Sequence, residues 1–301
     1  MIRKAQKVLV GALSLFFLCV NTIVCFVAIF PFALLKALVP LQAIRAFATK
    51  QVVVLGQAWI GVNSYFLSLL GLLCLRLEGD VPQNLETSYL VWSNHQSWVD
   101  IMVLQNALNR RIPFLRFFIK SELFWVPLMG IAWWALDFPF MKRYTKEEIA
   151  KDPRKKGADL KTTQEACEKF RGLNISILNF LEGTRFTPEK RDALASPYKN
   201  LLPPKSGGVA AVLSAMGSQF HSLVDVTIFY PKGPRSFLSL LSGGVGEVLV
   251  HVDMVPIPSH LARTKAEGED ADWKEVQEWI RSRWAQKDEL LSRMKEQALV
   301  K

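Results

Sequence analysis

The sequence contains little cysteine and histidine, with four of each among 301 residues. The cysteines Cys19, Cys25, Cys74 and Cys167 form no CxxC pair, and no cysteine stands near a histidine at a spacing typical of metal ligands. We therefore expect four free thiols in a reducing compartment and no metal site. The Gly-x-Ser-x-Gly turn that exposes a serine nucleophile is also absent, so a serine acyl-enzyme has no support.

Motifs of nucleic-acid-binding proteins are missing as well, although the formal net charge is +10. The basic residues gather near apolar segments, and 50% of all residues are hydrophobic. This combination suits an anionic membrane face, an acidic carrier or a phosphorylated substrate. We therefore expect membrane lipids, and no nucleic acid, as partners of the basic surface.

Two apolar runs lie in the N-terminal quarter of the chain. The first, Val8 to Leu35, is long enough to cross a bilayer as a tilted helix. It is too long for the usual core of a signal peptide and precedes no clear cleavage site, so we expect a retained anchor. The second run, Val52 to Leu75, is weaker, and positive charge flanks both runs on every side. Residues 1–76 are thus predicted to form a membrane-embedded helix pair that either spans the bilayer or dips into one leaflet.

Residues 77–260 alternate short apolar strands with helices, which is typical of an α/β domain. The charged segment 142–161 inside this region is expected to be an exposed loop. The expected strands are 88–92, 117–119, 175–181, 223–229 and 247–255, and the expected helices are 100–107, 159–170 and 207–216.

Residues 261–301 form a third region, an amphipathic helical segment. Its apolar residues recur at helical spacing at Val276, Ile280, Trp284, Leu291 and Met294. We expect this stripe to pack on the α/β domain, and a place in the membrane surface is the alternative.

His95 and Asp100 stand where the strand at 88–92 gives way to the helix at 100–107. On one continuous helix the two side chains would lie about 140° apart and would not meet. They can meet if His95 lies on the loop and Asp100 in the first turns of the helix. Asp100 can then accept one imidazole N–H, which leaves the other nitrogen free to take a proton. The pair predicts a general base that activates a substrate hydroxyl, with a structural histidine as the alternative.

Two further strand ends carry polar residues. In the sequence FLEGTRF, Gly183 permits a tight turn, and Arg185 offers a planar fork suited to phosphate. Glu182 is expected to orient either Arg185 or the headgroup of a substrate. Lys120 can supply a second phosphate contact. A strand-end turn closed by an ion pair is the alternative for the first of these motifs.

These three motifs resemble those of the lysophospholipid acyltransferase family, which includes the bacterial PlsC-type enzymes. Residues 94–100 (NHQSWVD) match the family's NHx4D motif. Residues 120–123 (KSEL), with Pro127 and Gly130, look like its second motif, and residues 180–185 (FLEGTR) are similar to its third. The resemblance covers about residues 60–255. It implies a mixed sheet flanked by helices and preceded by N-terminal membrane helices.

The resemblance also implies a role for each matching residue. His95 would deprotonate the acceptor hydroxyl, and Asp100 would orient His95. Thr184, with its neighbours Glu182, Gly183 and Arg185 and with Lys120, would hold the acceptor and its phosphate. The donor would be an acyl-CoA or acyl-carrier-protein thioester, with no metal or other cofactor. The implied reaction acylates a lysophospholipid, with lysophosphatidic acid at sn-2 as the first choice of acceptor.

Asp225 departs from the family pattern, because an apolar strand of the family usually carries a proline there. This departure and the form FLEGTRFTPEK look more like YihG-type bacterial membrane acyltransferases and the eukaryotic lysophospholipid and lysocardiolipin branch. Lysophosphatidylglycerol or lysocardiolipin is therefore the alternative acceptor. A non-catalytic membrane-associated interaction protein is the alternative outside enzymes, although the intact His95 and Asp100 argue against it. The expected location is the bacterial inner membrane, with the catalytic domain on the cytoplasmic side.

Overall fold

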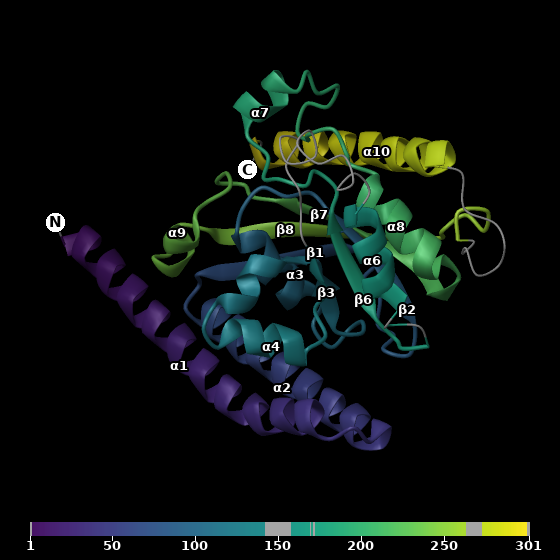
Figure 1. Cartoon of the computed structure of the whole chain (residues 1–301). Helices are drawn as coiled ribbons and strands as arrows, with labels where there is room; N and C mark the ends of the chain where they lie inside the picture. Colours follow the sequence, from purple (N-terminus) through teal and green to yellow (C-terminus); the bar gives the residue numbers. More distant parts are fainter. Residues whose placement is uncertain (1, 142–157, 169, 171, 263–272, 300–301) are drawn as a thin grey trace, which may run out of the picture.

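A six-stranded sheet lies at the centre of the computed structural model, which describes residues 2–141, 158–168, 170, 172–262 and 273–299 (Figure 1). The order of strands across the sheet is β1-β8-β7-β2-β6-β3. All neighbours are parallel except β7 and β8, so the predicted mixed α/β sheet is confirmed. The strands are β1 (Leu73–Gly79), β2 (Ser88–Ser93), β3 (Leu115–Phe117), β6 (Ser176–Phe180), β7 (Phe220–Phe229) and β8 (Gly246–Val255).

Both faces of the sheet are covered, which explains why the four inner residues of β2, between Ser88 and Ser93, are all apolar. Tyr89 and Val91 pack into the core on one face, whereas Leu90 and Trp92 pack into the core on the other. This alternation is what a central strand requires when neither of its faces meets water.

Helices from distant parts of the sequence supply the two covering layers. The first layer contains α3 (Val99–Leu108), the end of α2 (Gln42–Leu69) and α9 (Phe237–Leu241). The second contains α6 (Ala158–Glu168), α8 (Gly207–Met216) and α10 (Trp273–Leu299). Smaller elements complete the fold: β4 (Ile119–Lys120) paired with β5 (Phe140–Met141), the 3-10 helix Ser121–Trp125, α4 (Met129–Ala135), α7 (Pro188–Ala193) and the 3-10 helix Gly217–Gln219.

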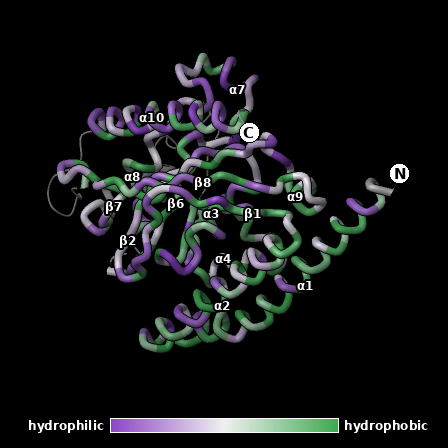
Figure 2. Tube along the Cα trace, turned by 180° about the vertical axis from the view of Figure 1, so that it is seen from behind, coloured by the Kyte–Doolittle hydropathy of each residue, from purple (hydrophilic) through white to green (hydrophobic). Residues whose placement is uncertain are grey.

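The N-terminal helices α1 (Ile2–Leu38) and α2 form a hairpin beside the sheet domain, and α4 packs on it (Figure 1). Both helices are long and apolar enough to cross a membrane. The 37 residues of α1 would extend roughly 55 Å, against about 30 Å for the hydrocarbon core of a bilayer. Figure 2 shows hydrophobic residues along both helices, and large apolar side chains of α1 such as Phe16 and Val27 are exposed. This surface is consistent with membrane association.

Two expected boundaries differ from the structure. The second apolar run does not continue as a helix to Leu75, because α2 ends at Leu69 and the chain turns at Gly71 with φ of +63°. The residues that follow form β1, an edge strand paired with β8, so the predicted boundary at residue 76 falls inside a strand. The single strand expected at 117–119 is split, because Phe117 ends β3 in the main sheet and Ile119 begins β4 in the small sheet.

The C-terminal helix α10 packs on the sheet domain as expected. Its five apolar stripe residues are buried, and Trp279 lies against Trp92 with ring centroids 4.7 Å apart. This stripe therefore belongs to the core of the domain. Of the expected charged loop, residues 142–157 lie outside the part of the chain that the structure describes.

Candidate active site

The carboxyl ends of β2, β6 and β7 meet at one edge of the sheet because the three strands are parallel. Asn94, directly after β2, is buried and pairs with the backbone of Ile228 on β7. Its amide nitrogen donates to the Ile228 carbonyl at 2.9 Å, and its oxygen accepts the Ile228 N–H at 2.8 Å. This pair of hydrogen bonds to the neighbouring strand fixes where the chain leaves the sheet. The next residue, His95, is thereby held at the edge where α/β proteins bind ligands.

His95 and Asp100 are brought together in the way the sequence predicted. The Nδ1 atom of His95 lies 2.8 Å from Oδ2 of Asp100, which stands in the first turn of α3. The same oxygen accepts the backbone N–H groups of Gln96 at 2.6 Å and Ser97 at 2.8 Å. An ionised carboxylate only accepts, so this geometry assigns the proton to Nδ1 and leaves Nε2 free to accept. The ring of Phe180 stacks on the imidazole at 4.1 Å and limits its rotation.

Tyr230 completes the surroundings of Asp100 and was missed by the sequence analysis. Its hydroxyl donates to Oδ1 of Asp100 at 2.6 Å. Burial and the charge of Asp100 raise the pKa of Tyr230 well above its ordinary value, so the hydroxyl stays a donor. A signal was available, since Tyr230 directly follows the apolar strand β7, whose end lies beside that of β2.

The carboxylate of Glu182 contacts the backbone of the loop that carries His95. Its side chain is 1% exposed. One carboxylate oxygen accepts the N–H of His95 at 2.7 Å, and the other accepts the N–H of Leu202 at 3.0 Å. Burial raises the pKa of Glu182 to about 7, and these two hydrogen bonds oppose the rise. The carboxylate of Glu182 thus holds these two backbone groups, and its expected contact with a headgroup stays a prediction.

The other predicted binding residues do line one cavity together with His95. These residues are Lys120, Gly183, Thr184 and Arg185. The guanidinium of Arg185 lies 4.9 Å from the centroid of the Trp98 ring, a cation–π contact that the sequence analysis did not anticipate. Thr184 accepts a hydrogen bond from Lys190 at 2.9 Å.

Gly183 has a left-handed backbone with φ of +65°, as its expected turn requires. A methyl group on this residue would stand 3.1 Å from the Nζ atom of Lys205. The ammonium group of Lys205 therefore adds a cation beside the loop that sequence reasoning did not single out.

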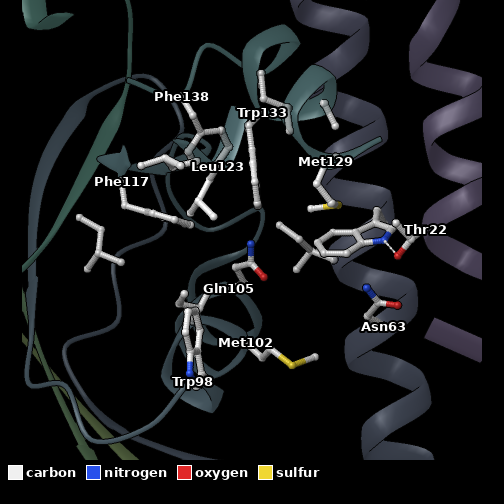
Figure 3. Close-up of a pocket in the computed structure, with 18 of the residues that line it drawn as sticks. Thr22, Asn63, Trp98, Met102, Gln105, Phe117, Leu123, Met129, Trp133 and Phe138 are labelled. Atoms are coloured by element: carbon white, nitrogen blue, oxygen red, sulfur yellow. Dashed lines mark hydrogen bonds between the residues drawn. The ribbon is translucent and has the colours of Figure 1, made fainter. Parts of the chain in front are cut away.

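The cavity has a volume of about 1180 Å³, which is above the range of roughly 300–1,000 Å³ common for ligand pockets. Its walls are mostly apolar side chains of α1, α2, α3 and α4 and of the loops around β3 and β4. Figure 3 shows Phe117, Leu123, Met129 and Trp133 around this space. In the α1–α2 hairpin, Trp59 donates a hydrogen bond to Thr22 at 3.2 Å, drawn as the dashed line. No carboxylate is among the described residues that line this cavity, which suits an apolar chain with an anionic end.

Asp225, the departure from the family pattern, contacts α10 and does not line this cavity. Its carboxylate lies 2.6 Å from Nζ of Lys287 and 3.1 Å from a guanidinium nitrogen of Arg283. Lys287 also donates to the carbonyl of Val226 at 2.7 Å. Burial lowers the pKa of Lys287, and the charge of Asp225 opposes that effect. This buried cluster joins α10 to β7.

Comparison with known proteins agrees with this architecture. The chain is 28% identical over 174 residues to "1-acyl-sn-glycerol-3-phosphate acyltransferase 3" of Arabidopsis thaliana, a match that covers 53% of this chain and 43% of the plant protein. It is 27% identical over 235 residues to "Lysocardiolipin acyltransferase 1" of Gallus gallus, with 73% of this chain and 56% of that protein covered. The chain thus spans about half the length of the curated relatives it matches.

A solved structure and a family profile complete the comparison. The crystal structure of the 1-acyl-sn-glycerophosphate (LPA) acyltransferase PlsC from Thermotoga maritima has a TM-score of 0.56 at 16% identity, covering 96% of this chain and 98% of that one. This likeness shows a common fold that includes the N-terminal helices. The profile of the Acyltransferase family matches residues 75–231, just over half of the chain. The matched region contains His95, Asp100, Lys120 and residues 182–185. The chain therefore belongs to the Acyltransferase family.

Proposed function

We propose that this protein transfers a fatty acyl group from a thioester to the free hydroxyl of a lysophospholipid. The observation that carries this proposal is that His95, whose Nδ1 atom is paired with Asp100, lines a large apolar cavity together with Lys120 and Arg185. A base, an apolar space for acyl chains and cations for a phosphate are what such a transfer needs. Lysophosphatidic acid acylated at sn-2 is the proposed acceptor.

The proposed reaction needs no covalent enzyme intermediate. Nε2 of His95 takes the proton of the acceptor hydroxyl as its oxygen attacks the thioester carbonyl carbon. The tetrahedral intermediate collapses by breaking the C–S bond, and the leaving thiolate takes the proton from the imidazolium. The carboxylate of Asp100 stabilises the imidazolium, and Tyr230 and two backbone N–H groups hold this carboxylate in place.

The acceptor phosphate is assigned to Lys120 and Arg185. In lysophosphatidic acid the phosphate is attached to the carbon next to the one that bears the sn-2 hydroxyl, so it must lie close to His95. Both cations line the same cavity as His95, and a guanidinium binds phosphate in a bidentate manner. The two proposed donors are acyl-CoA and acyl-carrier protein, both thioesters of the same phosphopantetheine arm.

A second acceptor is favoured by the comparison, because two of the matched relatives carry the name lysocardiolipin acyltransferase. Lysocardiolipin has two further acyl chains, and the cavity exceeds the usual size of a ligand pocket. The exposed apolar surface of α1 and α2 supports placement of the protein at a membrane, and we propose the cytoplasmic side of the bacterial inner membrane.

The test is an acyl-transfer assay of the full-length protein in detergent. It offers lysophosphatidic acid, lysophosphatidylglycerol and lysocardiolipin, each with acyl-CoA and acyl-carrier protein. His95→Ala should lower kcat by roughly 10²- to 10⁴-fold, the usual contribution of general base catalysis. His221→Ala, exposed at the opposite end of β7, is the matched control and should retain activity.

Two outcomes of this assay contradict the proposal. Equal transfer by His95→Ala and the unmodified protein would remove the base from the mechanism. No transfer from either donor to any of the three acceptors would favour a non-catalytic role at the membrane. Arg185→Ala should raise KM for phosphate-bearing acceptors with a smaller effect on kcat, because Arg185 is expected to bind and not to react.

A further inference from the structure

A second cavity of about 550 Å³ lies at the same edge of the sheet and was not anticipated from the sequence. Its walls come from the loop after β2, the loop after β6, the loop after β7 and the last turns of α10. All three loops follow the carboxyl ends of parallel strands, the position at which open α/β sheets bind ligands. Nothing in the proposed reaction so far uses this space.

The charged residues of this cavity are all basic. Arg185, Arg235 and Lys295 line it, and none of its described lining residues is a carboxylate. The ammonium group of Lys295 is hydrogen-bonded to the side chain of Asn200, which fixes that cation at the cavity. The backbone of Arg235 is held by the Oγ of Ser97, which donates to its carbonyl at 2.5 Å. Three cations on defined elements around one space favour an anionic ligand.

The second cavity adjoins the large apolar cavity that His95 lines, which we call the acyl cavity because the proposed reaction places the acyl chain in it. Trp98 and Arg185 line both, with the guanidinium of Arg185 over the Trp98 ring. In Figure 3, Trp98 stands at the edge of the acyl cavity. Gln96, the residue after His95, also lines the second cavity. A ligand whose reactive atom is at His95 can therefore extend past Trp98 into the basic space.

When the acceptor is lysophosphatidic acid, the proposed first choice, only the donor has a phosphate far from its reacting atom. The phosphate of the acceptor is bound next to the carbon of the attacking hydroxyl, which keeps it at Lys120 and Arg185 beside His95. The thioester carbon of the donor is joined to its first phosphate through the whole pantetheine arm. A basic cavity that adjoins the cavity of His95, without being lined by His95 itself, matches the donor.

We propose that the cavity formed by Trp98, Arg235 and Lys295 binds the phosphate end of the donor's phosphopantetheine arm. This inference rests on the proposed acyl transfer, because it places the thioester at His95 and the acyl chain in the large cavity. The shared chemistry is the phosphopantetheine phosphate, which acyl-CoA and acyl-carrier protein both carry. Arg235 is the residue to test, since Arg185 also serves the acceptor.

The test compares Arg235→Ala with the unmodified full-length protein on three donors with the same acyl chain. These are acyl-CoA, acyl-phosphopantetheine and acyl-pantetheine, and the last lacks phosphate. Truncating Arg235 leaves its backbone carbonyl bond to Ser97 in place. We expect KM for the two phosphate-bearing donors to rise roughly tenfold, the effect of one lost charge-assisted hydrogen bond. KM for acyl-pantetheine, KM for the lysolipid and kcat should each change less than about twofold, because Arg235 is proposed to contact only the donor phosphate.

Lys232→Ala is the matched control, since Lys232 is exposed in the same loop and is not among the described residues that line the cavity. Loss of affinity with all three donors alike, or a loss that appears in KM of the lysolipid, would overturn the inference. So would a loss confined to acyl-CoA, because it would assign Arg235 to the nucleotide phosphates.

A direct binding measurement separates this inference from the proposed function. Free CoA bound to the protein in detergent is measured by equilibrium dialysis, with and without Arg235→Ala. Suppose that the protein transfers no acyl group but binds CoA roughly tenfold more tightly than its Arg235→Ala variant does. The proposed acyl transfer is then refuted, and the proposed phosphate site is supported. If CoA binds equally well to the unmodified protein and to Arg235→Ala, the proposed phosphate site is refuted, whether or not acyl transfer occurs.

Discussion

Replacing Glu182 by glutamine separates a positioning role from the substrate contact that the sequence suggested. The carboxylate of Glu182 accepts two backbone N–H groups, from His95 and from Leu202. Glutamine keeps one acceptor but turns an NH2 group towards the other N–H, so a buried donor faces a donor. Leaving one such group unsatisfied costs about 1–3 kcal/mol. At pH 8, where Glu182 is ionised, this cost opposes the stabilisation gained by removing a buried charge, so we expect the free energy of unfolding to change by less than about 3 kcal/mol.

The same substitution should reduce kcat more than it changes KM. Glu182 does not line the cavity, whereas its partner His95 does. Phe186 donates a second backbone hydrogen bond, to the His95 carbonyl at 2.7 Å, so the loop after β6 holds His95 from both sides. A loosened His95 should lower kcat by roughly 10- to 100-fold, the size of effect expected when a reacting group is displaced. KM for the lysolipid should change less than about twofold.

The pH dependence of stability gives an independent readout of Glu182. Its pKa rises from 4.5 to about 7 on folding, and burial is the main cause. The folded chain therefore binds this proton more tightly than the unfolded chain, so stability falls as the pH rises between these two values. One pKa unit corresponds to about 1.4 kcal/mol, which gives a loss of about 3 kcal/mol across that window. Glu182→Gln should lack this loss in thermal unfolding followed in detergent.

The matched control is Glu189→Gln, because Glu189 is exposed on the neighbouring helix α7. It should change neither kcat nor the pH dependence of unfolding between pH 4.5 and 7, because the hydrogen bond with Thr187 lowers the pKa of Glu189 and so places its titration below this window. A large rise in KM for the lysolipid with kcat intact in Glu182→Gln would show that Glu182 touches the substrate. Identical pH dependence of stability in the variant and the unmodified protein would show that Glu182 does not titrate in this window.

Three further predictions concern other parts of the structure. Tyr230→Phe removes the hydroxyl that donates to Asp100 and should lower kcat roughly tenfold with little change in KM, as measured in the acyl-transfer assay. Lys287→Met leaves the buried charge of Asp225 with a single basic partner and should destabilise the protein by about 3 kcal/mol, measured by thermal unfolding. Met129→Trp fills part of the large cavity and should shift donor preference from palmitoyl towards decanoyl thioesters.

Each of these predictions has an outcome that contradicts it. Tyr89→Phe, at the opposite end of β2, is the control for Tyr230→Phe, and an equal kcat in the two variants would deny Tyr230 a role in holding Asp100. An unchanged melting temperature in Lys287→Met would mean that the buried ion pair does not fasten α10. A uniform loss with both donors in Met129→Trp would mean that the acyl chain does not reach Met129.

Local patterns in the sequence predicted most of the elements, because they depend on spacing alone. The burial of both faces of β2 required a continuous apolar run, and the stripe of α10 required apolar residues at helical spacing. The meeting of His95 with Asp100 was also predictable, since a loop residue and a first-turn carboxylate are separated by only five positions. Between Leu69, where α2 ends, and Leu73, where β1 begins, the chain stays apolar, so the hydropathy pattern predicted the wrong boundary between the two elements.

The sequence by itself determined the mixed α/β domain, the apolar helix pair, and the contact of His95 with Asp100, because each depends on residues near one another in the chain. Only the tertiary structure decided what distant residues do. It brought the hydroxyl of Tyr230 to Asp100, directed the carboxylate of Glu182 to the backbone of His95, and paired Asp225 with α10. It also brought Arg235 and Lys295 to one cavity. The reason is that these contacts depend on the order and direction of the strands. That arrangement decides which strand ends share an edge of the sheet, and local hydropathy does not encode it.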